Sequence, residues 1–177
     1  IVGQSDAGVD VAYLLRYEDS GGTKRITALR DKNLVATAQI NYNTTLIIDQ
    51  WYHVVMSDDG TNLRIYLDGV EVQSGATNTG NGNDGLSDRF RAGTNTNDDS
   101  PIDGQIAHVF CYSAAISAAR IANLRWKKPS DNDTDIQLYW PLDENTGSTV
   151  ADHAGTANNG SITTSQWVSQ HPPTTYK

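Results

Sequence analysis

The sequence predicts an all-β protein in which two antiparallel sheets pack as a β-sandwich, with one short helix. Segments rich in β-branched and aromatic residues recur about every ten residues, as they do in β-sandwiches. Clusters of Gly, Asn and Asp separate these segments, and aspartate, a turn former, outnumbers glutamate by 18 to 3. Long runs of helix-forming residues are absent, and 177 residues suffice to bury one core without disulfides.

Each expected strand is a short run of such residues, and turn-forming residues separate most of these runs. In chain order the predicted strands are Val11–Tyr17, Arg25–Arg30, Leu34–Ile40, Thr45–Ile48, Trp51–Met56, Leu63–Leu67, Val70–Gln73, Arg89–Ala92, Gln105–Tyr112 and Ile136–Trp140.

The strongest local pattern is a hairpin in the middle of the chain. Leu63, Ile65 and Leu67 alternate with polar positions, which predicts one buried and one wet face. Asp68-Gly69 follows, and this pair readily adopts the positive φ angles of a two-residue turn. We expect the Trp51–Met56 strand to lie antiparallel beside Leu63–Leu67, with Trp51 and the three aliphatic residues at least partly buried.

Three segments fall outside the strands. Ser117 is placed to cap a helix over Ala118–Leu124, in which Ile121 and Leu124 are spaced to rest on a sheet edge. Residues 77–88 are polar and rich in glycine, which favours a long loop. Residues 169–177 are predicted to form a tail.

Charge and cysteine content exclude several classes of partner. The net charge is −8, and the largest basic cluster is the pair Lys127-Lys128, so nucleic acid and anionic membranes are poor partners. No apolar run approaches the ~18 residues of a membrane span. Cys111 is the single cysteine, which excludes an internal disulfide, and its apolar neighbours predict a buried thiol.

Two blocks of sequence carry a family resemblance. Residues 50–70 contain Trp51, Val54 and the segment Tyr66-Leu67-Asp68-Gly69, and residues 102–117 contain Asp103-Gly104 before the predicted helix. Together they resemble the laminin-G-like branch of the concanavalin-A-like superfamily, which implies a jelly-roll fold and often a carbohydrate ligand. Ala107 and His108 stand where the family often has an acidic pair.

A third block lies near the end of the chain. Residues 138–144, 150–152 and 158–161 resemble the segment that usually opens such a domain. Either residues 136–168 complete the sandwich in a permuted order, giving one domain over 1–168, or a second repeat begins near Asp135 and stops early. We favour the first alternative because about forty residues cannot bury a sandwich core alone.

The residue types do not support catalysis. Glycosidases need two carboxylic residues that flank the scissile bond, and on this fold these are closely spaced glutamates. The only glutamates are Glu18, Glu71 and Glu144, far apart in sequence. A jelly-roll lyase would need a His/Tyr/Gln cluster; His108 and Tyr112 share a face of the predicted strand, whereas Gln105 points the other way. We therefore expect a non-enzymatic protein.

Calcium is the one ion that the sequence suggests. Ca²⁺ takes about six to eight oxygen ligands, which loops dense in Asp supply. Asp98, Asp99 and Asp103 form the preferred candidate for a structural Ca²⁺ site, and Asp58-Asp59 form a second cluster. The competing interpretation of both is a solvated turn.

The sequence thus favours a recognition module that binds carbohydrate, as part of a larger extracellular, secreted or virion-associated protein. The alternative is a structural or assembly domain of a phage or surface particle that contacts protein and binds no sugar. A jelly-roll polysaccharide lyase or hydrolase is the third hypothesis.

Overall fold

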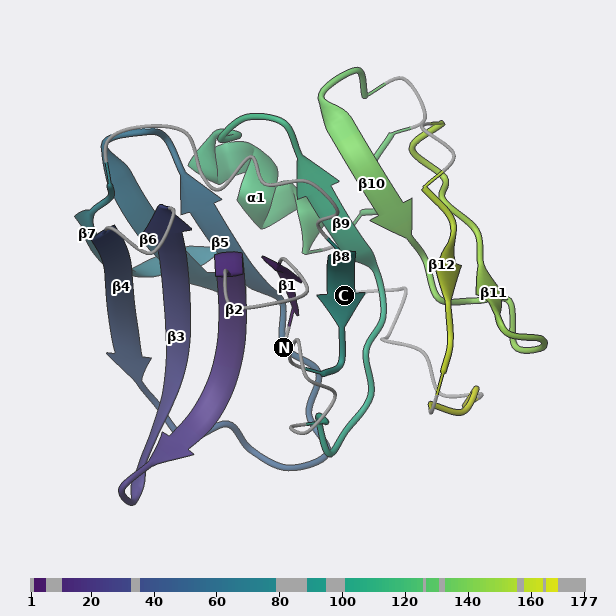
Figure 1. The fold of residues 1–177 in the computed structure, drawn as a ribbon, viewed down its shortest axis with the longest axis horizontal. Helices are drawn as coiled ribbons and strands as arrows, with labels where there is room; N and C mark the ends of the chain where they lie inside the picture. The colour runs from purple at the N-terminus through teal and green to yellow at the C-terminus, as the bar shows by residue number, and fades with distance from the viewer. Residues whose placement is uncertain are drawn as a thin grey trace.

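The computed structural model describes residues 2–5, 11–32, 36–78, 89–94, 101–125, 127–130, 133–155, 158–163 and 165–168. In this part of the chain the elements are β1 (Val2–Ser5), β2 (Val11–Ser20), β3 (Thr23–Lys32), β4 (Ala36–Asn43), β5 (Val54–Asp58), β6 (Asn62–Leu67), β7 (Val70–Ala76), β8 (Arg89–Ala92), β9 (Val109–Tyr112), α1 (Ala118–Leu124), β10 (Ile136–Trp140), β11 (Thr149–Val150) and β12 (Gly160–Ser161). Figure 1 shows their arrangement.

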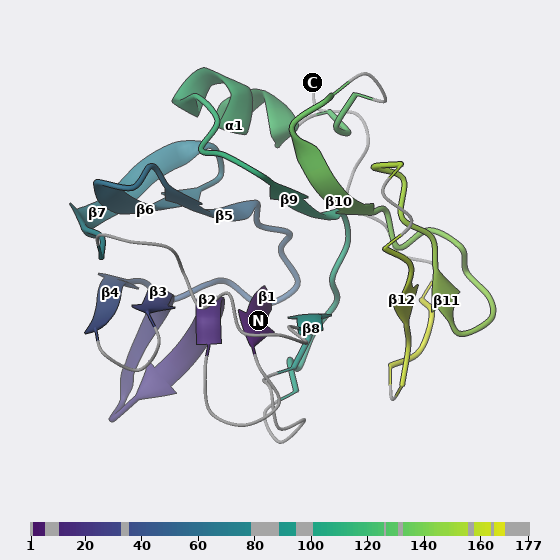
Figure 2. The same ribbon diagram turned by 45° about the horizontal axis from the view of Figure 1, so that its top comes forward.

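Every strand pair is antiparallel, and the described strands form four sheets rather than the predicted two. A five-stranded sheet has the order β4-β3-β2-β1-β8, and a three-stranded sheet has the order β5-β6-β7. The pairs β9-β10 and β11-β12 stand separately. Figure 2 shows β9 and β10 extending the layer of the three-stranded sheet without joining its hydrogen-bond ladder. The prediction of antiparallel β structure with one short helix is confirmed, and that of two continuous sheets is not.

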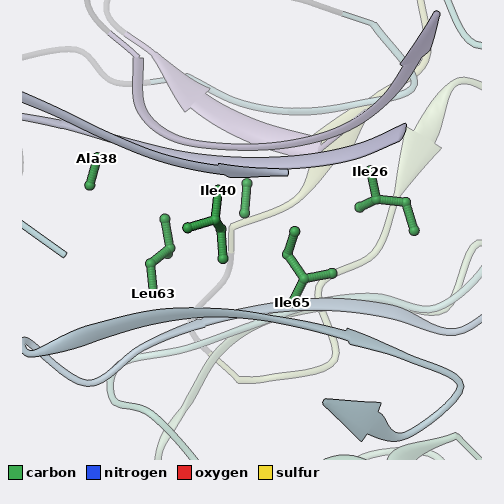
Figure 3. Packing of buried hydrophobic residues seen from close by; sticks show 6 residues of the cluster. Ile26, Ala38, Ile40, Leu63 and Ile65 are labelled. Carbon is green, nitrogen blue, oxygen red and sulfur yellow. The ribbon is translucent and has the colours of Figure 1, made fainter. Parts of the chain in front are cut away.

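The core lies between the five-stranded and three-stranded sheets. Alternating residues of β3, β4 and β6 point into this space, where Ile26, Ala28, Leu63 and Ile65 are at most 1% exposed. Figure 3 shows the side chains of Ile26, Leu63 and Ile65 meeting between the two ribbons. Since burying an aliphatic side chain contributes about 1.5–3 kcal/mol, this cluster fixes which face of β3 and β4 is turned outward.

The predicted hairpin is confirmed. Strands β5 and β6 are antiparallel, Leu63 and Ile65 are buried, and Trp51 and Leu67 are half-buried. Asp68 and Gly69 have φ angles of 54° and 82°, as a two-residue turn with both central residues at positive φ requires. Gly69 has a second reason to be glycine, because a Cβ there would lie 2.9 Å from Cα of Ala122 in α1.

Helix α1 has the predicted bounds and cap. The Ser117 side chain accepts a hydrogen bond from the backbone N–H of Arg120, and Ile121 is fully buried. Because Gly69 lies against Ala122, the β6-β7 turn packs directly on this helix.

Strand β10 has the predicted bounds, Ile136–Trp140, and pairs with β9. The Trp140 indole donates a hydrogen bond to the carbonyl of Asn158 (2.9 Å) and lies against Gly160, where a Cβ would approach the ring to 3.0 Å. These contacts dock the C-terminal segment onto β10. That 1–168 form one domain stays a prediction.

Three local predictions are wrong. Thr45–Ile48 is not a strand: the hydroxyls of Tyr17 and Tyr52 accept hydrogen bonds from the backbone N–H groups of Leu46 (3.2 Å) and Ile47 (2.9 Å), in place of a neighbouring strand. Ile47 and Ile48 are consequently 67% and 86% exposed.

The other two corrections concern the segment before α1. Strand β9 begins at Val109, not Gln105, because His108 has a φ of 55°, which interrupts extended backbone. Cys111 is exposed rather than buried, although alternation along β9 gives it the same face as the buried Val109, and the register with β10 shifts next to it. Surrounding protein nevertheless raises the pKa of its thiol by desolvation.

Candidate functional site

The outer side of the five-stranded sheet carries the largest connected set of polar side chains in the described structure. Because Ile26 and Ala28 of β3 point into the core, Arg25 and Thr27 point outward. The strand register places Arg16 and Asn41 on either side of Thr27, and Glu18 beside Arg25. We call this set the polar face; its members are Arg16, Glu18, Arg25, Thr27, Gln39 and Asn41.

The sheet presents most of the polar face openly, although Thr27 itself is fully buried. Figure 1 looks onto the outer side of β2, β3 and β4, and no helix or strand lies in front of them. The side chains of Arg16, Glu18 and Arg25 are 34%, 21% and 23% exposed, so each is partly packed and partly accessible. A ligand could therefore approach these groups without rearrangement of an element.

Glu18 is the centre of the network. Its Oε1 accepts hydrogen bonds from Nε of Arg25 (2.9 Å) and from the Thr27 hydroxyl (2.8 Å), and its Oε2 lies 3.0 Å from a terminal nitrogen of Arg16. Burial alone would raise the pKa of Glu18, but these hydrogen bonds and the two guanidinium charges outweigh it, so the pKa lies below its ordinary value. Glu18 is thus an ionised acceptor held in one orientation.

Amide groups extend the network onto β4. The Thr27 hydroxyl lies 2.9 Å from Oδ1 of Asn41, and Nε2 of Gln39 donates to the same oxygen (3.1 Å). One hydroxyl has one proton, so Thr27 donates to either Glu18 or Asn41 at a time. Nε of Arg16 is shielded from solvent and has no hydrogen-bond partner within the described residues. The polar face therefore combines fixed donors and acceptors with spare hydrogen-bonding capacity.

An ion pair between the sheets supports this surface from below. Arg30 of β3 contacts Asp58 at the end of β5 (2.8 Å), and both side chains are less than 10% exposed. Arg30 also donates to the carbonyl of Asn78 (3.0 Å), and Asp58 accepts from the Thr77 hydroxyl (3.0 Å). The Asp58 carboxylate is thus already paired with a positively charged side chain of the protein.

Asp59, the other member of that acidic cluster, organises a turn. Its Oδ1 accepts hydrogen bonds from the backbone N–H groups of Thr61 and Asn62, and its Oδ2 pairs with Arg64. The Asn62 hydrogen bond foremost, then Arg64 and Thr61, lower its pKa to about 2. Asp59 thus forms a turn, as the turn interpretation predicts, whereas Asp58 is buried in an ion pair rather than solvated.

A second polar surface lies beside α1. It is an open depression of about 410 Å³, lined by Arg120, Asn123, Leu124, Lys127, Lys128, Ser130, Asp133, Thr134 and Asp135. Arg120 pairs with Asp133 and lies 5.0 Å from the centre of the Tyr112 ring, while the Tyr112 hydroxyl donates to Asp133 (2.8 Å). Burial first, and then this bond to Asp133, raise the pKa of Tyr112 to about 12. The tyrosine is neutral and its partners are committed to one another.

Of the three residues preferred for calcium binding, only Asp103 lies in the described part of the chain. Asp98 and Asp99 lie outside the described residues, and the Asp103 carboxylate is exposed. Within the described ranges, no three His, Cys, Asp or Glu side chains are grouped closely enough to hold a metal ion. The calcium site stays a prediction.

The residues considered for catalysis are dispersed. Glu18 belongs to the polar face, Glu71 of β7 contacts Arg64 and Tyr66 of β6, and Glu144 accepts a hydrogen bond from the backbone of Ala151. His108 lies 3.1 Å from the Tyr139 hydroxyl rather than beside Tyr112 on one strand face. The strand face that His108 and Tyr112 were predicted to share does not form, because β9 begins after His108.

Sequence analysis missed the polar face. The signal was present as alternation: the polar Arg25 and Thr27 alternate with the apolar Ile26 and Ala28. Combining it with Arg16 and Asn41 required the register of three strands, which local patterns do not supply.

The fold and the polar face together define a β-sheet protein that presents an open, hydrogen-bonding surface. Residues 1–122 match the model of the concanavalin A-like lectin/glucanases superfamily, and the chain belongs to this family. The predicted resemblance is thereby confirmed. No curated protein matches the chain.

Two solved structures are similar to the chain. One is a proposed carbohydrate-binding protein from Bacteroides ovatus, with a TM-score of 0.68 and 18% identity; the match covers 90% of this chain and 46% of that one. The other is an S-layer domain-containing protein from Clostridium thermocellum, with a TM-score of 0.35 and 18% identity over 68% of this chain and 59% of that one. The chain thus spans about half the length of these structures. In the described part of the chain, none of the helices has the length and apolar character needed to cross a membrane.

Proposed function

We propose that the chain is a non-catalytic carbohydrate-recognition module and that the polar face binds the sugar. The observation that carries the proposal is the Glu18-centred network, which holds two guanidinium groups, a carboxylate and an amide in one plane of the sheet. Sugar hydroxyls both donate and accept, so an ionised acceptor flanked by planar donors is complementary to them.

Family membership and the fold similarity to the Bacteroides ovatus protein support this proposal. A module of this kind belongs to a larger extracellular, secreted or virion-associated protein, and its partner is a glycan rather than nucleic acid or a membrane. The net charge of −8 agrees with that choice because it disfavours binding to nucleic acid and to anionic membranes.

The test is glycan-array binding, followed by titration of the best ligand against variants. Arg25→Ala is expected to weaken binding about tenfold or more, since a hydrogen bond that involves a charged group contributes about 1.5–3 kcal/mol. Asn41→Ala removes a neutral amide, whose hydrogen bond contributes about 0.5–1.5 kcal/mol, so it should weaken binding about two- to tenfold. Lys127→Ala is the matched control, because it removes a charged side chain from the depression beside α1. Its affinity should equal that of the wild type.

Other outcomes would overturn the proposal. Loss of binding in Lys127→Ala with full binding in Arg25→Ala would move the site to the depression beside α1. Absence of any glycan binding would favour the structural or assembly domain. Release of reducing ends or unsaturated uronates from a bound polysaccharide would establish the lyase or hydrolase.

A structural Ca²⁺ held by Asp98, Asp99 and Asp103 is part of the proposal. An ion that binds only the folded state stabilises it by about 2.7 kcal/mol at a hundredfold excess over Kd, so chelation is expected to lower the melting midpoint. Asp98→Asn/Asp99→Asn should remove this dependence. Asp49→Asn is the control for the loss of an exposed turn carboxylate, and it should retain the dependence. A wild-type melt that ignores both calcium and chelator would return the three aspartates to the role of turn formers.

A further inference from the structure

Strand β4 differs from the other strands that end the five-stranded and three-stranded sheets. An open edge invites pairing, and proteins usually protect it with charges, proline, bulges or shortness. Strands β5, β7 and β8 all carry charged residues, β8 has four residues, and a register shift interrupts the β6-β7 ladder. Strand β4 (Ala36–Asn43) has eight residues, no charge, no proline and an unbroken register with β3.

Half of the backbone hydrogen-bonding groups of β4 point away from β3. The N–H of Thr44 bonds to the carbonyl of Lys24, which fixes the alternation of the β3-β4 ladder. Residues 38, 40 and 42 therefore direct their backbone groups toward β3. Thr37, Gln39, Asn41 and Asn43 direct theirs away from the sheet, where no described residue pairs with them.

The chemistry of β4 matches a second copy of itself. Antiparallel pairing centred on Ile40 places Gln39 opposite Asn41 and Thr37 opposite Asn43 of the other copy, so all four outward residues form hydrogen-bonded pairs. Each such pair exchanges two bonds, which gives about eight in total. On the other face Ile40 meets Ile40 and Ala38 meets Tyr42, so polar residues face polar residues and apolar residues face apolar ones.

Charge also favours this edge for self-association. Two copies of a chain with a net charge of −8 repel each other, and a strand without charged side chains brings the fewest like charges together. A basic or acidic partner would find no opposite charge on β4 itself.

We propose that two copies of the chain pair through β4 into a symmetric dimer, so that the two five-stranded sheets become one continuous sheet. The dimer does not depend on what the polar face binds. Its consequence does rest on the proposed function: both polar faces would then lie on the same side of one sheet, and the second binding event to a repeating glycan would become intramolecular.

The test is sedimentation of the full chain from micromolar to millimolar concentration, with Gln39→Lys and Gln39→Glu variants. In the proposed pairing the two copies of residue 39 are diagonal neighbours about 7–8 Å apart, within reach of long side chains. The wild type should show a concentration-dependent dimer, and each variant alone should be at least tenfold weaker. An equimolar mixture of the two variants should recover the dimer, which simple misfolding would not do.

Ser74→Lys on the exposed side of β7 is the matched control, and it should dimerise as the wild type does. A wild type that stays monomeric throughout the range overturns the proposal. So does a dimer that Gln39→Lys leaves intact, or a mixture of the variants that remains monomeric, since each assigns the contact to another surface. Sugar binding by a monomer would leave the proposed function standing while the dimer fails.

Discussion

Replacing either Arg30 or Asp58 with alanine is expected to lower the free energy of unfolding by about 3 to 5 kcal/mol, because the other charge would remain buried and unpaired. The two side chains are 7% and 8% exposed, so water cannot take over the lost contact. The Asn78 carbonyl and the Tyr13 ring, 5.6 Å from the guanidinium carbon, compensate only part of the Arg30 charge.

Urea unfolding monitored by tryptophan fluorescence measures this effect. The informative control is the double variant Arg30→Met/Asp58→Leu, which removes both charges and keeps much of the volume. It should be more stable than either alanine variant, since replacing a buried ion pair with apolar residues of similar volume often leaves the free energy of unfolding unchanged. Alanine variants within about 1 kcal/mol of the wild type would contradict the burial of the pair, because that is the range of exposed pairs.

The parts of the fold that sequence predicted are those set by neighbouring residues. The Asp68-Gly69 turn, the alternation of Leu63 and Ile65 and the cap at Ser117 are local, and all are present in the structure. The strand predicted over Thr45–Ile48 does not form. Its β propensity is strong, but the hydroxyls of Tyr17 and Tyr52 bond to its backbone in place of a neighbouring strand.

The candidate site depends on contacts between distant residues. Thr27 reaches Asn41 fourteen residues away, and Arg30 reaches Asp58 twenty-eight residues away. No spacing rule connects such residues before the strand order and register are known. For the same reason the sequence suggested Asp58 as a calcium ligand, although a cation from the facing sheet already neutralises it.

Acid sensitivity should trace to one histidine, His53. Both of its ring nitrogens are shielded from solvent and lack a hydrogen-bond partner within the described residues, and Phe110 lies 6.0 Å away. Burial lowers its pKa to about 4, an effect that Asp68 opposes and Arg125 adds to. The folded protein therefore prefers the neutral imidazole.

The direction of the pH effect follows from the two states. The unfolded chain has a histidine pKa near 6.5 and binds the proton first, so the stability that the neutral ring provides is complete above pH 6.5 and is lost as the pH falls toward 4. Over that window the loss is about 3 kcal/mol, at about 1.4 kcal/mol per pH unit. Ionised Glu18 and Asp133 lose their stabilising contacts only at lower pH, because their folded pKa values lie below their ordinary ones.

Urea unfolding at a series of pH values between 7 and 4 tests this assignment. His53→Phe keeps an aromatic ring beside Phe110 and has no proton to bind, so its free energy of unfolding should stay nearly constant across the window. His153→Gln removes an exposed imidazole and should keep the wild-type slope. A His53→Phe variant that loses stability with pH as steeply as the wild type would show that another group carries the acid sensitivity, and that the imidazole is hydrated or paired in solution.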